Sequence, residues 1–346
     1  MFQNLYKPNF SEKERQEIRR KELLQQQKLK RLKQQDEQRS LKDPHASEYK
    51  RKFYHKKRKI NNNIENINLQ LSEWLKEKPE NFDDWLLVPC PKGQRCIVVA
   101  ARGETKMFSK NKRYRMTFSS LLPGGGILGS SNDSCILDCI YSKEMDIFYI
   151  LDALHFSIPL VDCDAEFRFF WLKSKLNDLD EFERKLKYDD LKLFELLEYY
   201  DMSNEERTSV ALQRYPLWVD NRPQLDGFLF YHKKSHYVCG TTPLVCWLFA
   251  FMLPDVLQLP VSRCYEPPDN YCKQNPWQYM DEFDKRLKIK TKQWNQQEYP
   301  LEENSTAMDE DLEYVEENLD ETCMDKDNVL DSLLTAEKLL ELAEEN

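Results

Sequence analysis

The stretch VPCPKGQRCIVVAARGETK, residues 88–106, places a polar turn between two apolar runs. Val88 closes the first run, Ile97 opens the second, and the turn between them carries Lys92, Gly93 and Arg95. Two short apolar runs around a glycine-containing turn predict a β-hairpin. Basic side chains on such a turn can hold a phosphate or can simply be solvated. The turn therefore has three possible roles: it could carry catalytic residues, bind a phosphate, or only reverse the direction of the chain.

Apolar and aromatic segments continue on both sides of this stretch. LQLSEWL and DDWLLVPC lead into it, and RYRMTFSSLLPGGG, SCILDCIYSKEMDIFYILDALHF, FRFFWLKSKL, LDGFLFYHKKSHYVCG and TPLVCWLFAFML follow. Several of them are short, rich in β-branched or aromatic residues and separated by polar turns, which predicts antiparallel strands joined by hairpins. Residues 178–214 are charged with recurring Leu and Phe, and predict a helix. Together these segments indicate an α+β fold of antiparallel sheets with flanking helices.

Charge is distributed unevenly along the chain. Residues 1–60 hold 19 Lys and Arg against 8 Asp and Glu, whereas residues 301–346 hold 2 against 17. Oppositely charged ends of this kind predict solvated interaction arms around a globular middle. We therefore expect the chain to have four parts: a basic helical arm (1–43), a basic linker (44–65), a central domain (66–298) and an acidic, mostly disordered tail (299–346).

The basic arm has the composition of a long helix. Residues 11–40 contain no Gly or Pro, and Ser11 with Glu14 has the spacing of a capping box. Because its apolar residues make only a narrow stripe, we expect this helix to become ordered on a partner; the alternative is a solvated charged helix. A second basic cluster, Lys50–Lys59, suits either a nuclear-localisation signal or contact with RNA phosphates.

No cofactor or metal is expected from the sequence. His232 and His236 are four residues apart, but they lack the Glu of a zinc-protease helix. The segment PGGGILG lacks the Lys-Ser/Thr of a P-loop. The ten cysteines lie scattered, several in apolar stretches, which predicts reduced thiols. A run of about 18 apolar residues, as a membrane span requires, does not occur.

Several uncommon strings, taken together and in order, resemble the snurportin family. They are LSEWL, CPKGQR, FSSLLPGG, ILDCIY, DCDAEFRFFWLKSKL, DGFLFYHKKSHY and TPLVCWL, and they cover about residues 70–260. Snurportins are import adaptors that bind the trimethylguanosine cap of spliceosomal small nuclear RNAs. The resemblance implies a cap-binding domain with the fold of the nucleotidyltransferase part of mRNA-capping enzymes.

The same resemblance implies that no enzyme activity remains. The capping enzymes carry a lysine nucleophile in a Lys-x-Asp-Gly-x-Arg motif. If Gly93 and Arg95 are placed on its Gly-x-Arg, Cys90 falls at the nucleophile and Lys92 falls where the Asp belongs. A covalent lysyl-nucleotide needs the missing amine. Cys90, beside Pro91, is therefore expected to be a packed thiol, and Arg95 to hold a phosphate.

The resemblance also assigns residues to the cap. Trp247 would stack on the trimethylguanine, whose positive charge strengthens the contact. Ser72, Trp74, Arg95 and Lys110 would line the cap and its phosphates. The interaction with three phosphates would be sensitive to salt.

For the arm, the resemblance implies binding to a nuclear transport receptor. In EIRRKELLQQQKLKRL the candidate contacts with importin-β, or with another importin, are Arg19, Arg20, Lys28, Lys30 and Arg31. Phe2 and Leu5 offer a poor match to the family's contact with the export receptor. The protein would shuttle between cytoplasm and nucleus.

Two other functions stay open at this point. The first is an active nucleotidyltransferase with an unusual nucleophile. The second is a general RNA-binding scaffold that uses the basic arm. The charge balance between the two ends also predicts that the acidic tail folds back on the arm.

Overall fold

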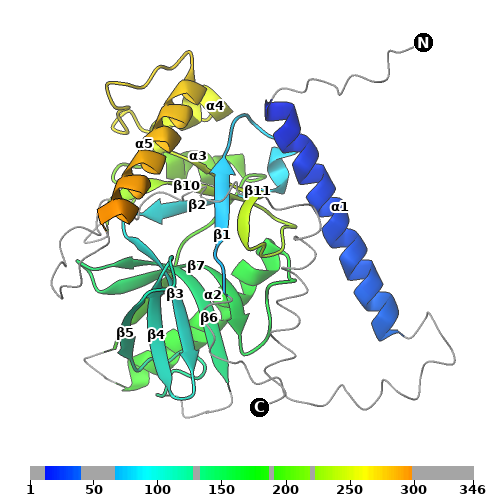
Figure 1. The fold of residues 1–346 in the computed structure, drawn as a ribbon. Helices are drawn as coiled ribbons and strands as arrows, with labels where there is room; N and C mark the ends of the chain where they lie inside the picture. The colour runs from blue at the N-terminus through cyan, green and yellow to red at the C-terminus, as the bar shows by residue number, and fades with distance from the viewer. Residues whose placement is uncertain (1–11, 40–66, 128–132, 187–190, 219–222, 298–346) are drawn as a thin grey trace.

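Two β-sheets form the centre of the structure, a computed structural model that describes residues 12–39, 67–127, 133–186, 191–218 and 223–297 (Figure 1). The five-stranded sheet has the order β1-β11-β10-β2-β9, and the six-stranded sheet has the order β5-β4-β3-β6-β7-β8. Most neighbours are antiparallel, but β1 pairs with β11, and β7 with β8, in parallel. The α+β prediction is confirmed, with mixed rather than purely antiparallel sheets.

The strands have the following bounds: β1 Gln70–Trp74, β2 Trp85–Pro91, β3 Gln94–Ala101, β4 Glu104–Ser109, β5 Tyr114–Phe118, β6 Ser134–Ser142, β7 Ile147–Phe156, β8 Leu193–Leu196, β9 Tyr200–Asp201, β10 Leu225–His232 and β11 Gly240–Leu248. The helices are α1 Glu12–Gln38, α2 Ala165–Leu186, α3 Glu205–Leu212, α4 Leu253–Leu257 and α5 Pro276–Gln297, with short 3-10 turns η3 Phe82–Asp84 and η4 Ala250–Met252. In the described part of the chain, none of the helices is long and apolar enough to cross a membrane.

The opening stretch joins the two sheets. The sequence predicted one hairpin, but β2 pairs with β9 and β10, whereas β3 pairs with β4 and β6. The turn at Lys92–Gly93 therefore carries the chain from one sheet to the other. The true hairpin of this stretch is β3–β4, which turns at Arg102 and Gly103, both at positive φ.

Strand β2 is buried along its whole length, which explains its continuous apolar sequence. Leu86, Val88 and Cys90 face a core between the sheets, where they meet β7 and β10. Trp85 and Leu87 face the opposite way, into a core covered by α3, α4 and α5.

The segment FRFFWLKSKL forms helix α2 and not a strand. Its buried residues Ala165, Phe169, Leu172 and Leu176 recur at helical spacing. The predicted helix over 178–214 is correspondingly wrong in its middle, where β8 and β9 lie. Aromatic content favoured strand at the first segment, but tertiary packing decided otherwise.

Candidate functional site

Trp247 lies in β11 with its indole half-buried against strand β10. A Cβ atom on Gly227 would lie 2.4 Å from Cζ2 of Trp247, so glycine at this position lets the ring rest on the backbone of β10. The ring of Phe249 meets the indole edge-on at 6.0 Å between centroids. Trp247 is therefore held in place while part of its surface stays accessible.

Strand β1 brings Ser72 and Trp74 beside β11. In the parallel pairing, Trp74 is the partner of Trp247, and Ser72 is the partner of Thr242. Trp74 is itself buried, and its Nε1 donates a hydrogen bond to Asp284 Oδ1 at 2.8 Å. Of the paired indoles, Trp247 is thus the one with surface available to a ligand, and Trp74 packs on helix α5.

Arg95 lies beneath the start of β1 and is 7% exposed. Its Nε and Nη2 donate to the two carboxylate oxygens of Asp138 at 3.1 and 2.9 Å, and Nη2 also donates to the carbonyl of Gln70 at 2.7 Å. Burial works to lower the pKa of Arg95, but the Asp138 charge raises it overall, so the guanidinium is charged. Arg95 as a phosphate ligand stays a prediction, because a phosphate would share this guanidinium with Asp138.

The thiol of Cys90 is packed in the core between the sheets. Cys90 is buried, and its Sγ lies 3.6 Å from the carbonyl of Val88. Burial raises the pKa of this thiol, and the nearby Asp226 carboxylate raises it further. A neutral, enclosed thiol is a poor nucleophile, and the expected packed role of Cys90 is confirmed.

Asp226 is an acidic residue that the sequence motifs did not single out. It occupies a bulge in β10 between Leu225 and Gly227, next to the glycine that supports Trp247. Burial raises the pKa of Asp226 to about 7, although the Lys92 charge opposes the shift. The sequence pattern that could have identified Asp226 is LDGFLF, in which an acidic residue directly precedes the glycine.

Lys110 follows the last residue of β4 and is half-exposed. The same turn carries Lys112. Burial raises the pKa of the Cys239 thiol, and the positive charge of Lys112 opposes this rise. Since Cys239 directly precedes β11, this basic turn lies toward the strand that carries Trp247. The role of Lys110 at the cap stays a prediction.

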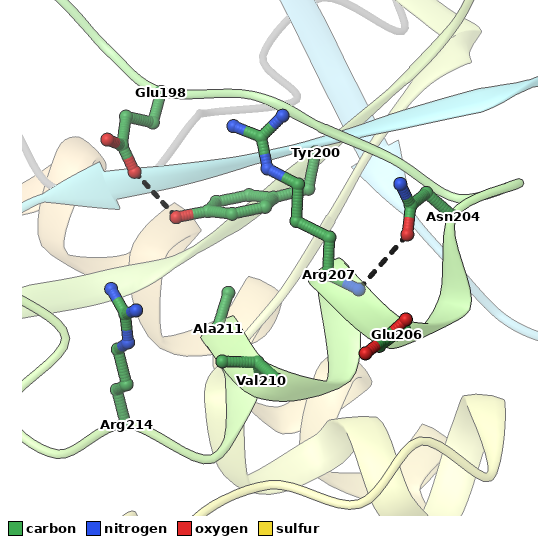
Figure 2. Close-up of a pocket in the computed structure, with 8 residues that line it drawn as sticks. All are labelled: Glu198, Tyr200, Asn204, Glu206, Arg207, Val210, Ala211 and Arg214. Atoms are coloured by element: carbon green, nitrogen blue, oxygen red, sulfur yellow. Dashed lines mark hydrogen bonds between the residues drawn. The ribbon is translucent and has the colours of Figure 1, made fainter.

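A pocket of about 430 Å³ at the β9 edge is a weaker candidate for stacking (Figure 2). Tyr200 donates to Glu198 at 2.6 Å, and the guanidinium of Arg207 lies over the tyrosine ring, 5.4 Å from its centroid. Its aromatic face is therefore already covered by a cation of the protein. The β9 edge is also the opposite edge of the five-stranded sheet from β1.

The predicted receptor-binding residues lie on α1, and most of them contact the domain itself. Arg19 pairs with Glu73, Lys30 with Asp162 and Arg31 with Asp164, at 2.5 to 3.3 Å. Arg20 is buried against β11, whereas Lys28 is exposed. The arm was expected to become ordered on a partner, and in this structure its helix is docked on the chain's own domain.

A sequence model of the snurportin-1 m3G cap-binding domain matches residues 68–250. The chain belongs to this family. The match includes Ser72, Trp74, Arg95, Lys110 and Trp247, and excludes both α1 and α5. The matched part of the chain is thus the cap-binding domain of the snurportin family.

Solved structures with similarity to this chain include DNA ligases. The ligase domain of M. tuberculosis LigD is 13% identical with a TM-score of 0.34, and the match covers 53% of this chain and 59% of that chain. A mycobacterial DNA ligase D complexed with ATP and MES is 12% identical with a TM-score of 0.34, covering 53% and 60%. A Lig E DNA ligase is 13% identical with a TM-score of 0.32, covering 53% and 68%. This snurportin-family chain thus spans about three fifths of the LigD ligase chains that it matches.

Proposed function

We propose that the chain binds the 2,2,7-trimethylguanosine cap of spliceosomal small nuclear RNAs through the indole face of Trp247. The observation that carries the proposal is the half-exposed Trp247, fixed on Gly227 in a chain of the snurportin family. The methylated base carries a positive charge, which an indole face attracts. Stacking of a base on an aromatic side chain contributes about 1–3 kcal/mol.

Other groups that the family resemblance assigns to the cap would complete its recognition. Ser72 and Trp74 lie on the strand that pairs with β11, and Lys110 extends from the turn after β4. The carboxylate of Asp226, beside Gly227, would add attraction for the cationic base. The cap phosphates would contact Lys110 and share Arg95 with Asp138, which makes binding weaker as salt rises.

The proposal includes no covalent chemistry. In the motif placement that the family resemblance implies, Cys90 falls at the position of the capping enzymes' lysine, and it is buried with a raised pKa. A phosphoramidate cannot form on a thiol, and a thiol that stays protonated does not attack a phosphorus atom. Incubation with labelled GTP or ATP and magnesium should leave the protein unlabelled; a covalent adduct that Cys90→Ser removes would support the nucleotidyltransferase alternative instead.

We further propose that the protein is an import adaptor that shuttles between cytoplasm and nucleus. The basic helix α1 supports this part, because three of its five candidate cations, Arg19, Lys30 and Arg31, pair here with acidic groups of the domain. The receptor would be importin-β or another importin. The candidate export-receptor contacts Phe2 and Leu5, the Lys50–Lys59 cluster and the acidic tail lie outside the described residues.

Competition among cap analogues tests the proposal against a general RNA-binding scaffold. Trimethylated, monomethylated and unmethylated dinucleotide caps should compete in that order for a fluorescent trimethylated probe. A scaffold that uses its basic arm would bind all three equally, because each carries the same phosphates.

A further inference from the structure

Helix α1 lies alongside the domain (Figure 1). Its cations pair with an acidic surface of the domain, formed by Glu73, Glu80, Asp162 and Asp164. We propose that this surface is the resident binding site of α1, and that an importin must displace the helix before it can bind it. The first half of this inference stands on the contacts alone. The second half rests on the proposed adaptor function.

The N-terminal half of α1 is anchored by two buried polar side chains. Arg20 is 3% exposed; its Nε donates to the carbonyl of Pro243 at 3.0 Å, and its guanidinium lies over the ring of Trp85, 5.1 Å from the centroid. Gln16 is also buried, and its Nε2 donates to the carbonyl of Trp74 at 3.0 Å and to Glu73 at 2.8 Å. Enclosed hydrogen bonds of this kind are stronger than solvated ones, so they identify a specific contact.

These anchors reach an irregular part of the sheet. The pairing of β1 with β11 shifts between Ser72 and Glu73, where three residues of β11 from Pro243 onward have no partner in β1. Arg20 and Gln16 donate to backbone carbonyls on the two sides of this shift. The helix therefore adds hydrogen bonds to the sheet at the place where the parallel pairing is irregular.

Ion pairs accompany the anchors and continue the contact toward the C-terminal end of α1. Arg19 donates through both Nη atoms to Glu73, at 2.5 and 2.8 Å, and Lys21 pairs with Glu80 at 3.0 Å. Further along, Arg31 donates to Asp164 at 2.5 Å and lies 2.9 Å from Nε2 of His236. Burial and the Arg31 charge lower the pKa of His236, so its imidazole is neutral and can accept this hydrogen bond.

The docked face of α1 is also the face assigned to the receptor. Arg19, Arg20, Lys30 and Arg31 cannot pair with the domain and with an importin groove at the same time. The apparent receptor affinity is then the intrinsic affinity multiplied by the fraction of molecules in which the helix is released. Weakening the docked state should raise receptor affinity by the factor by which it increases helix release.

The test neutralises the acidic surface and leaves the helix sequence intact. The variant Glu73→Gln/Asp164→Asn removes two groups that pair with α1. The control Glu144→Gln/Glu266→Gln removes the same charge at two exposed sites outside the acidic surface. Hydrogen exchange of the full-length proteins reports helix release, because a helix with so little apolar surface to pack depends on its docked contacts for stability. The affinity of each for recombinant importin-β is measured in parallel.

Amides of α1 in the original protein should be protected, and the surface variant should exchange about tenfold faster, as the loss of two ion pairs predicts. The variant should bind importin-β more tightly by a similar factor, with the control unchanged. Unprotected α1 amides, or equal exchange in variant and control, would overturn the docking site. Faster exchange with unchanged importin affinity would overturn the competition. If neither protein binds importin-β while α1 is protected, the adaptor function fails for this receptor and the docking site stands.

Discussion

Replacing Arg95 by Met should destabilise the protein strongly, because Arg95 links the two sheets. Its guanidinium joins Asp138 of β6 to the carbonyl of Gln70 in β1. Methionine fills a similar volume but leaves the Asp138 carboxylate buried without its cationic partner, although the Tyr237 hydroxyl still donates to it. Removing one partner of a buried ion pair costs about 3–5 kcal/mol.

Thermal and urea unfolding measure this loss. A change of 1 kcal/mol shifts the melting temperature of a chain of 150–250 residues by about 2–4 °C, so Arg95→Met should melt about 6–20 °C lower. The double variant Arg95→Met/Asp138→Leu should recover much of the loss, because it leaves no unpaired charge. If Arg95→Met unfolds within about 1 kcal/mol of the original protein, the ion pair does not link the sheets as the geometry indicates.

Three further variants or probes test the site. Gly227→Ala should displace the indole of Trp247, 2.4 Å from the new Cβ, and lower the unfolding free energy by about 1–3 kcal/mol together with cap affinity; unchanged cap affinity would contradict the support role of the glycine. Asp226→Asn should raise the unfolding free energy at pH 8 and change it little below pH 4. The reason is that a carboxyl whose folded pKa is raised to about 7 destabilises the fold once the pH exceeds its unfolded pKa. An equal effect of the substitution at both pH values would refute the raised pKa. Iodoacetamide should label exposed Cys264 and spare Cys90 until the protein unfolds, as mass spectrometry would show; labelling of both in the native protein would mean that Cys90 is accessible.

The sequence predicted the strands better than their partners. Alternating and continuous apolar runs identify β2 and β3, because each follows from burial along one segment. Which sheet a strand joins depends on pairing between segments distant in the chain, as when β2 pairs with β10. The opening stretch was therefore predicted as a hairpin although its turn at Lys92–Gly93 connects two sheets.

The family motifs predicted only those site residues that lie within the motifs, such as Trp247 and Trp74. Trp247 and Trp74 come together through the parallel pairing of β1 with β11, which no local pattern reveals. Asp226 was missed because its raised pKa depends on burial in the folded chain.

The docking of α1 also lay beyond the sequence patterns. Its anchors are Gln16 and Arg20, while Leu29 and Leu32 are exposed. The apolar residues of α1 therefore do not identify its contact face by themselves. A polar contact face is recognised only when the acidic surface that it meets is known.

The most direct test of cap recognition is the affinity of the Trp247→Ala variant for a trimethylated cap analogue. Fluorescence anisotropy with a labelled analogue would compare the original protein, Trp247→Ala and a control, Trp171→Phe, whose indole lies against the other sheet. Loss of the stacking face should weaken binding by about 5-fold to 150-fold, with the unfolding transition retained and the control unchanged. Binding of Trp247→Ala with the original affinity would contradict the assignment of the cap to this indole.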